Sequence, residues 1–228
     1  EVRAIDDTAG RSDHAELTLD DADGYHTPVH LGIPGRHNVM NALAAATVAM
    51  RYGMAPETVA RILASQHTIS PHRMALSTVN REGTSFTLID DSFNANPDSM
   101  KAGLNGLKAW HSNDGKEPFR VALLGAMLEL GADETALHTS IGTYADELGI
   151  DAIIAVGSAQ DQHLDALAQA LADGARQSQS ASVDCVHDID AAEQLVIDLA
   201  RNHPDAVVLL KGSHASGLSA LAERWAKN

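Results

Sequence analysis

From residue 71 onward, short apolar runs alternate with longer amphipathic stretches. The run at 206–210 is apolar on both faces, which is typical of parallel strands covered by helices on both sides. The stretch at 134–148 carries Leu137, Ile141 and Leu148 at helical spacing. The alternation predicts an α/β fold with a doubly wound, mostly parallel (Rossmann-like) sheet. We expect strands at 119–124, 152–156, 182–186 and 206–210, and helices at about 97–110, 134–148, 159–172, 189–202 and 216–227.

Residues 1–70 follow a different pattern. Alternating apolar and polar positions predict short strands at 15–19 and 26–31, separated by an acidic turn. A helix is expected from about 38 to 52, and because it is apolar nearly all round it should be buried on most sides. A second helix should begin at Pro56, since proline favours the first turn of a helix.

The pair Ser70-Pro71 marks a boundary between these two patterns. Directly after it, the runs at 74–79 and 84–90 flank a turn that contains Gly83, as in a β-hairpin. We therefore divide the chain into a smaller N-terminal part, 1–70, and an α/β domain, 71–228.

Composition narrows the functional classes. The chain has 228 residues, of which 44% are hydrophobic and 21% charged, so it can build a real core. Its net charge of −15 offers no basic face for nucleic acid or for an anionic membrane surface. No apolar run is long enough to span a membrane, and no secretory leader is visible. The single cysteine, Cys185, excludes a disulfide scaffold and fits a reducing cytoplasm.

Residues with useful chemistry follow the predicted strands, where ligands bind in doubly wound sheets. Residues 90–99 offer carboxylates and amides suited to a ribose, a magnesium shell or an amine, although ordinary turn chemistry explains them equally well. Asn96 is also a candidate helix cap before Pro97. Lys211 and Ser213 follow the last strand and are typical of an anion site. The alternative for Lys211 is an ion pair with a neighbouring carboxylate.

Other candidate motifs are fewer. His37, Asn38 and Asn41 cluster at the start of the apolar helix, where an asparagine amide can read an adenine edge or simply cap the helix. Twelve histidines form no metal-binding pattern, so we expect no histidine metal site. No phosphate-binding P-loop is present: the only Gly-Lys pair is followed by Glu117, and Trp110 occupies the place of the first glycine.

The chain carries five motifs in order, which are Gly35-Arg36-His37-Asn38-Val39-Met40-Asn41-Ala42-Leu43-Ala44-Ala45, Pro71-His72-Arg73-Met74, Asp90-Asp91-Ser92-Phe93-Asn94-Ala95-Asn96-Pro97, Leu124-Gly125-Ala126-Met127 through Gly131 with His138, and Lys211-Gly212-Ser213. Taken together, these motifs closely resemble the Mur ligases. That family has three domains, and the resemblance implies that 1–70 is the C-terminal part of the central ATPase domain and 71–228 the complete third domain. The P-loop would then lie upstream of Glu1.

The resemblance also implies roles for individual residues. His37, Asn38 and Asn41 would lie beside the adenine, Arg73 would reach the nucleotide phosphates, and Asp91 would reach the ribose. Arg73 and Lys211 would serve catalysis, and the amino substrate would dock on Asn94, Asn96, Lys211 and Ser213. The chain departs from the family pattern at four positions, which are His72 for glycine, Phe93 for tyrosine, Ala126 for aspartate and His214 for arginine.

The implied reaction is ATP-dependent amide formation through an acyl phosphate, in peptidoglycan precursor synthesis. The substrates would be UDP-N-acetylmuramoyl-tripeptide and D-Ala-D-Ala, with ATP and a Mg²⁺ held mostly by the upstream part. We expect a monomer that is inactive as this chain alone. Alternatives are a non-catalytic nucleotide- or dipeptide-binding module, a sister ligase of the folylpolyglutamate type, and a receiver-like domain with Asp90, Asp91 and Lys211 as its acidic pair and lysine.

Overall fold

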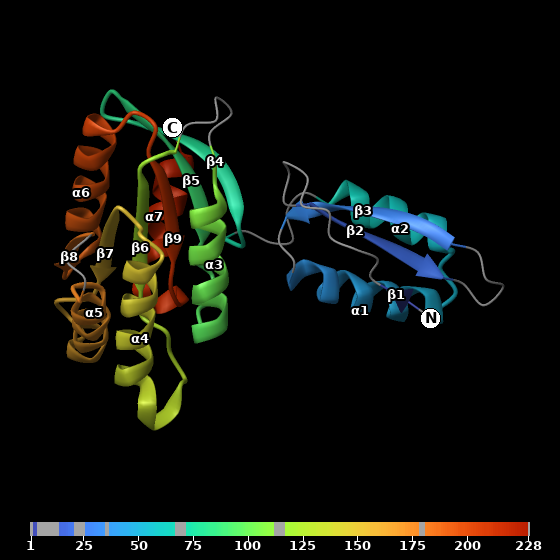
Figure 1. Ribbon diagram of the computed structural model, residues 1–228, viewed down its shortest axis with the longest axis horizontal. Coiled ribbons are helices and arrows are strands. Elements are labelled where there is room, and N and C mark those ends of the chain that lie inside the picture. The colour runs from blue at the N-terminus through green and yellow to red at the C-terminus, as the bar shows by residue number, and fades with distance from the viewer. Residues whose placement is uncertain are drawn as a thin grey trace. The chain divides into compact units, whose positions relative to one another are not determined.

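The computed structural model describes residues 2–3, 14–20, 26–34, 37–66, 72–111, 117–177 and 181–227. The chain divides into two compact units, residues 1–70 and 71–228 (Figure 1). Each unit has a hydrophobic core of its own. No helix in the described ranges combines the length and apolar character needed to cross a membrane.

Unit 1 is a three-stranded antiparallel sheet with two helices. The strands are β1 (Val2–Arg3), β2 (His14–Asp20) and β3 (His26–Pro34), in that order across the sheet. The helices are α1 (His37–Arg51) and α2 (Pro56–Ser65). The predicted strands and helices are confirmed, and the short β1 was not predicted. The core consists of Leu17, Leu19, Val29, Leu31, Ala42, Ala46 and Val59.

Helix α1 is less buried than its sequence predicted. Ala42 and Ala46 lie in the core of unit 1, whereas Met40 and Val48 are 69% and 57% exposed. The expectation of burial on most sides was therefore wrong for this unit. An apolar composition says that a helix has faces to bury, but it does not say which of them has a partner in the same unit.

Unit 2 is built on a six-stranded mixed sheet in the order β4–β5–β9–β6–β7–β8. β4 pairs with β5 in the antiparallel direction, and every other neighbouring pair is parallel. The predicted fold class is confirmed. The strands are β4 (Ala75–Arg81), β5 (Thr84–Asp91), β6 (Arg120–Gly125), β7 (Ala152–Val156), β8 (Ser182–Val186) and β9 (Val207–Lys211).

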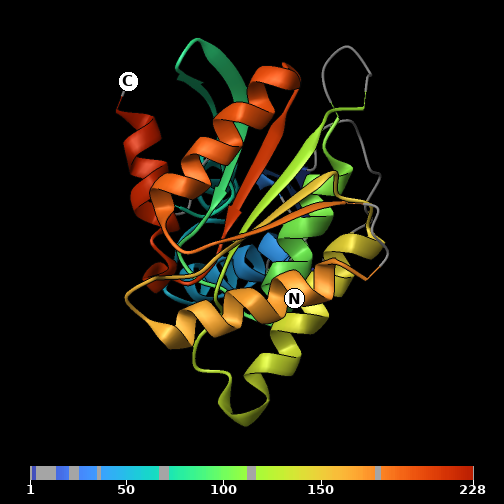
Figure 2. The ribbon, with the colours of Figure 1, turned by 90° about the vertical axis from the view of Figure 1, so that its left-hand side faces the viewer.

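Helices cover both faces of this sheet, and each face has its own core (Figure 2). α3 (Pro97–Ala109), α4 (Glu134–Glu147) and α5 (Gln162–Ala175) pack on one face. α6 (Ile189–Asn202) and α7 (Leu218–Ala226) pack on the other.

Two of these helices begin later than predicted. α5 starts at Gln162 because the Asp161 side chain accepts hydrogen bonds from the backbone N–H groups of the first turn and caps the helix. α7 starts at Leu218 because a short 3-10 turn, His214–Ser216, precedes it and Gly217 adopts a left-handed φ of 77°.

Candidate functional site at the carboxyl ends of the strands

The carboxyl end of β9 is a point where the connections of the sheet diverge. This strand lies between β5 and β6 and leads into α7 on one face of the sheet. Its two neighbours lead into α3 and α4 on the opposite face. Chain segments therefore diverge on either side of β9, which is where ligands bind in open α/β sheets. The register places Lys211 level with Asp91 of β5 and with Leu124 of β6.

Lys211 and Asp91 form an ion pair at this end of the sheet. The Nζ of Lys211 lies 2.5 Å from Oδ2 of Asp91 and 3.4 Å from the carbonyl oxygen of Asn94. Lys211 is only 1% exposed. Its aliphatic stem runs against Gly103 of α3, where a side-chain Cβ would come within 2.7 Å of the lysine Cδ. Lys211 therefore forms the ion pair that the sequence offered as the alternative to an anion site. A contact between Lys211 and substrate stays a prediction.

Asp90, one residue earlier, faces a different set of partners. Its Oδ1 accepts hydrogen bonds from the backbone N–H and the hydroxyl of Ser92, at 3.2 and 2.6 Å. Its Oδ2 lies 2.8 Å from Nδ1 of His72. The sequence analysis gave the nucleotide role to Asp91, named Asp90 only among the carboxylates of residues 90–99 and in the receiver-like alternative, and gave His72 no role. Successive strand residues point to opposite faces of a sheet, so only one of the two aspartates can meet Lys211, and that alternation was the available signal.

Arg73 lies beside the same loop. It is exposed, and its guanidinium carbon is 4.4 Å from the centre of the Phe93 ring, a cation–π arrangement. The backbone N–H of Phe93 donates to the carbonyl of His72 at 3.1 Å. The structure thus brings Arg73 to the end of β5, beside the loop that follows Asp91.

The two asparagines predicted to bind substrate serve the local backbone. Oδ1 of Asn94 accepts from the N–H of Ala95 at 2.8 Å. Asn96 caps α3: its Oδ1 accepts from the N–H of Ser99 at 2.8 Å, and its own N–H donates to the Ser99 hydroxyl at 3.0 Å. Ordinary turn chemistry therefore accounts for these contacts, which is the alternative that the sequence offered. A substrate role for either side chain stays a prediction.

Ser213 combines burial with an unused hydroxyl. It is 5% exposed, and its Oγ finds no hydrogen-bond partner among the described residues. Its backbone N–H donates to the carbonyl of Ala126 at 2.8 Å. Gly125 and Gly212 allow this close approach, since a Cβ on Gly212 would lie 2.9 Å from the Cα of Gly125. A buried hydroxyl without a partner is costly, so this one marks a place where a ligand could supply the missing contact.

His138 of α4 fixes the loop that follows β6. The residue is 0% exposed. Its Nε2 accepts from the N–H of Met127 at 2.8 Å, and its Nδ1 lies 2.7 Å from the carbonyl of Glu134. Burial lowers the pKa of His138, although the Glu134 contacts partly offset this. The ring is therefore neutral at pH 7, with Nδ1 as the donor, and it holds the loop next to Ser213.

The nucleotide-side candidates of unit 1 lie at the start of α1. Asn38 is buried, and its Oδ1 accepts from Nδ2 of Asn41 at 3.3 Å. Asn41 is exposed. The His37 side chain lies outside the described residues. These residues belong to a different unit from Arg73 and Asp91, so their approach to one nucleotide stays a prediction.

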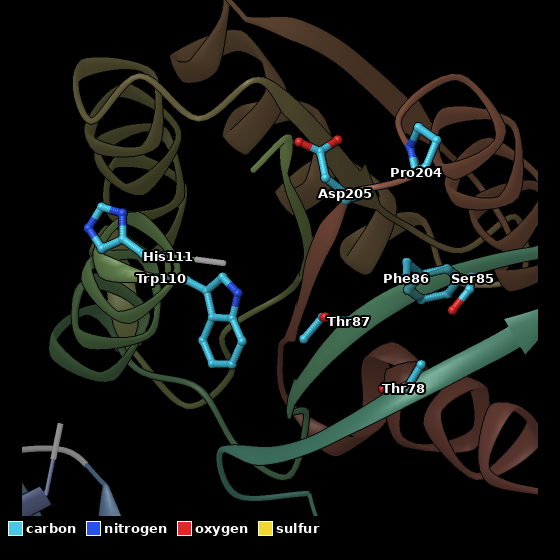
Figure 3. A pocket seen from close by; sticks show the side chains of 9 residues that line it. Thr78, Ser85, Phe86, Thr87, Trp110, His111, Pro204 and Asp205 are labelled. Carbon is cyan, nitrogen blue, oxygen red and sulfur yellow. The ribbon is translucent and has the colours of Figure 1, made fainter. Parts of the chain in front are cut away.

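A separate hollow of about 240 Å³ lies near the amino ends of β5 and β9, at the opposite end of these strands. Figure 3 shows its lining side chains, which come from β4, β5, the residues after α3 and the loop before β9. Trp110, Thr87 and Asp205 are among them. None of the predicted site residues lines this hollow.

Comparison with known proteins identifies the chain. A family model for the glutamate ligase domain of Mur ligases matches residues 72–214, which is more than half of the sequence. The chain belongs to the Mur ligase family. Arg73, Asp91, Asn94, Lys211 and Ser213 all lie inside the Mur ligase match.

Individual Mur ligases resemble the chain along most of its length. A UDP-N-acetylmuramoyl-tripeptide–D-alanyl-D-alanine ligase of Mycobacterium tuberculosis is 39% identical over 201 residues, covering 86% of this chain and 39% of the relative. A crystal structure of MurF from Acinetobacter baumannii has a TM-score of 0.75 at 25% identity, covering 100% of this chain and 44% of that one. The chain therefore spans about two fifths of the length of the Mur ligases it matches.

A folylpolyglutamate synthase of Mycobacterium tuberculosis, solved with ADP and AMPPCP, shares the fold. Its TM-score is 0.61 at 18% identity, covering 100% of this chain and 47% of that one. The likeness at this identity concerns the fold alone.

Proposed function

We propose that the chain is the C-terminal part of an ATP-dependent ligase that joins D-Ala-D-Ala to UDP-N-acetylmuramoyl-tripeptide. The observation that carries the proposal is the 39% identity to a ligase with that name, across 86% of the chain. In this reading, residues 1–70 complete a central ATPase domain and residues 71–228 form the third domain. A reaction that consumes ATP and a nucleotide-linked precursor places the enzyme in the bacterial cytoplasm.

The proposed chemistry requires little from the protein beyond positioning and charge. The tripeptide carboxylate attacks the γ-phosphate of ATP, which gives an acyl phosphate and ADP. The amine of D-Ala-D-Ala then attacks the acyl carbon, loses a proton and expels phosphate. Arg73 is exposed at the end of β5, where its guanidinium can neutralise phosphate charge. Asp91, held by Lys211, would accept hydrogen bonds from the ribose hydroxyls.

The amine substrate would dock between the loop after β5 and the loop after β9. The unpartnered Ser213 hydroxyl would donate to the dipeptide carboxylate, and the exposed Asn94 and Asn96 would line its entrance. Because Lys211 is buried beneath Asp91, its charge would act on substrate at longer range, through the electrostatic potential at the carboxyl end of β9.

Magnesium does not fit this chain by itself. Among the described residues, no three His, Cys, Asp or Glu side chains come together as a metal site. We propose that the portion of the relatives that this chain does not cover supplies the metal ligands and the phosphate-binding loop.

The test is a hybrid ligase, in which this chain replaces the matching part of the Mycobacterium tuberculosis relative. We expect the hybrid to release phosphate only when ATP, the UDP-linked tripeptide and D-Ala-D-Ala are all present. L-Ala-L-Ala is the matched control for the dipeptide, and this chain alone is the control for the missing portion. A folded hybrid that binds ATP but adds glutamate in place of D-Ala-D-Ala would assign the chain to a sister ligase.

A non-catalytic dipeptide-binding module is the alternative for the chain alone. Amide NMR shifts on titration with D-Ala-D-Ala separate the two cases. Selective shifts at residues 91–99 and 211–214, with none for L-Ala-L-Ala, would mean that unit 2 recognises the dipeptide without the rest of the enzyme. Shifts absent from the chain, together with an active hybrid, would mean that the dipeptide site forms only in the assembled ligase.

A further inference from the structure

The backbone on both sides of Arg73 is left-handed at residues that are not glycine. His72 has a φ of 61° and Met74 a φ of 49°. This region crowds the Cβ of an L-residue and is uncommon outside glycine, although asparagine, aspartate and histidine adopt it more often than other residues. A histidine persists in such a conformation only when surrounding contacts hold it there.

The contacts of the His72 side chain hold its backbone in this conformation. Its side chain is 16% exposed, and its Nδ1 lies 2.8 Å from Oδ2 of Asp90. Its Nε2 lies 3.6 Å from Oε1 of Glu223 on α7. Asp90 is itself fixed by Ser92, through hydrogen bonds to the serine N–H and hydroxyl. The imidazole is therefore tied to the end of β5 by a buried, fully engaged carboxylate.

One peptide unit joins His72 to Arg73, so the contacts that hold the backbone of His72 also constrain the backbone at Arg73. The carbonyl of His72 accepts from the N–H of Phe93 at 3.1 Å, so the main chain at residue 72 is anchored beside the Phe93 ring. The guanidinium of Arg73 lies over that ring, 4.4 Å from its centre. Phe93 is 46% exposed, and the contact is open to solvent. An exposed cation–π contact is weak, so it needs a backbone already directed toward the ring.

We propose that His72 is a positioning residue, which aims the guanidinium of Arg73 across Phe93 by holding the left-handed backbone at residue 72 against Asp90. The proposal deepens the proposed function because it rests on Arg73 as the group that meets phosphate. The positioning itself is a property of this chain and can be measured without any ligase reaction.

Two substitutions separate positioning from simple structural support. His72→Gly suits a left-handed backbone but removes the tie to Asp90. His72→Asn also suits that backbone, and its amide nitrogen sits one bond beyond Cγ, as Nδ1 does in histidine, so it can still donate to Asp90. Both variants should fold, and their melting temperatures in the full 228-residue chain provide the check.

The primary measurement is the NMR shift that the Phe93 ring imposes on the side-chain protons of Arg73. We expect wild type and His72→Asn to show the shift, and His72→Gly to lose most of it with little change in melting temperature. Phe93→Leu defines the value without a ring. A His72→Gly chain that keeps the wild-type shift overturns the proposal, as does a folded His72→Asn chain that loses the shift as completely as the glycine variant.

The second measurement is the KM for ATP in the hybrid ligase. We expect about a tenfold rise for His72→Gly, as for the weakening of one charge-assisted hydrogen bond, and recovery in His72→Asn. The KM for D-Ala-D-Ala should stay unchanged. If the NMR shift is lost while the KM for ATP holds, His72 positions Arg73 as inferred, and the phosphate role of Arg73 in the proposed function is what fails.

Discussion

At the scale of single residues, the ion pair between Lys211 and Asp91 lies at the carboxyl end of β9, where we propose that substrate binds. Lys211 is 1% exposed, and the Asp91 side chain retains 17% of its exposure. Two charges at this depth lose most of their hydration and depend on each other for compensation. Removing one partner therefore leaves the other as an uncompensated charge, whereas removing both does not.

This asymmetry gives a first prediction. Lys211→Met keeps the length of the stem along Gly103 but strands the Asp91 carboxylate, and should lower the free energy of unfolding by about 3 kcal/mol. The double variant Lys211→Met with Asp91→Asn should recover a large part of that loss. Urea unfolding of the three proteins measures both steps. Equal losses in the single and double variants would mean that the charges are not coupled.

His138 carries the second prediction at this scale. Burial lowers its pKa in the folded chain, so folding favours the neutral ring that accepts from Met127. Its contribution to stability is complete above its ordinary pKa of about 6.5. As the pH falls below that value, the unfolded chain takes up the proton first, and the contribution declines until the folded pKa is reached.

The pH dependence is checked by urea midpoints between about pH 7.5 and 5. His138→Gln should start from a lower midpoint and fall less over this range, since glutamine does not titrate. His111→Gln is the matched control, because that imidazole is 59% exposed and is not among the groups that shift the pKa of His138. A His138→Gln profile parallel to wild type would show that another group causes the acid loss.

Much of the candidate site could be predicted from residue types, but the contacts within it could not. Asp91, Lys211 and Ser213 were singled out because they follow strands, and the structure brings their segments to one edge of the sheet. The pairing of Lys211 with Asp91 depends on the β5–β9 register, which links residues 120 positions apart. His72 was marked only as a departure from a family pattern, because its left-handed backbone leaves no trace in a single sequence.

At the scale of elements, two glycines set the distance between α4 and α5. A Cβ on Gly142 would overlap the backbone carbonyl of Leu171, and a Cβ on Gly174 would overlap that of Thr139. At each glycine, the absence of a side chain thus lets the backbone of the other helix pack directly against this helix. Backbone atoms cannot rotate away as a side chain can, so the helices would have to separate to admit a methyl group.

We expect Gly142→Ala and Gly174→Ala each to destabilise unit 2 by about 1–3 kcal/mol, despite the better helix propensity of alanine. Gly106→Ala in α3 is the control. Its Cβ would meet only the flexible tip of Met74, at 3.3 Å, so the variant should be neutral or slightly stabilising. Thermal unfolding monitored by circular dichroism compares the three. An α4 or α5 variant as stable as the Gly106→Ala control would mean that the helices separate at little cost.

Most elements could be predicted from the sequence, because their periodicity and end signals agree. The α3 start is an example, since the Asn96 and Pro97 signals correspond to the observed cap and first turn. The start of α7 was placed about two residues early, because Ser216 and Gly217 close a tighter turn instead of opening the helix. The outer face of α1 was misjudged because burial depends on a partner surface, not on composition.

At the scale of the whole molecule, the cores differ in size and completeness. Unit 2 encloses its sheet between two layers of helices, each with a continuous apolar core. Unit 1 has one small core, while Met40, Val48 and Tyr52 remain 69%, 57% and 90% exposed. Apolar area removed from water is the dominant source of stability, so unit 2 should carry most of it.

The last prediction follows from this difference. A chain reduced to residues 71–228 should keep the urea midpoint of the main unfolding transition, because both cores of unit 2 remain intact. The complete chain should show an earlier and smaller transition from unit 1, with a midpoint that rises with protein concentration as exposed apolar residues associate. Replacing Met40, Val48 and Tyr52 with serine should abolish that concentration dependence and leave the main transition unchanged. The contrary result would be a single transition in the 228-residue chain whose midpoint is lost or shifted in the reduced chain. It would mean that the two units unfold as one cooperative body, and that unit 1 contributes to the stability of the unit that holds Lys211.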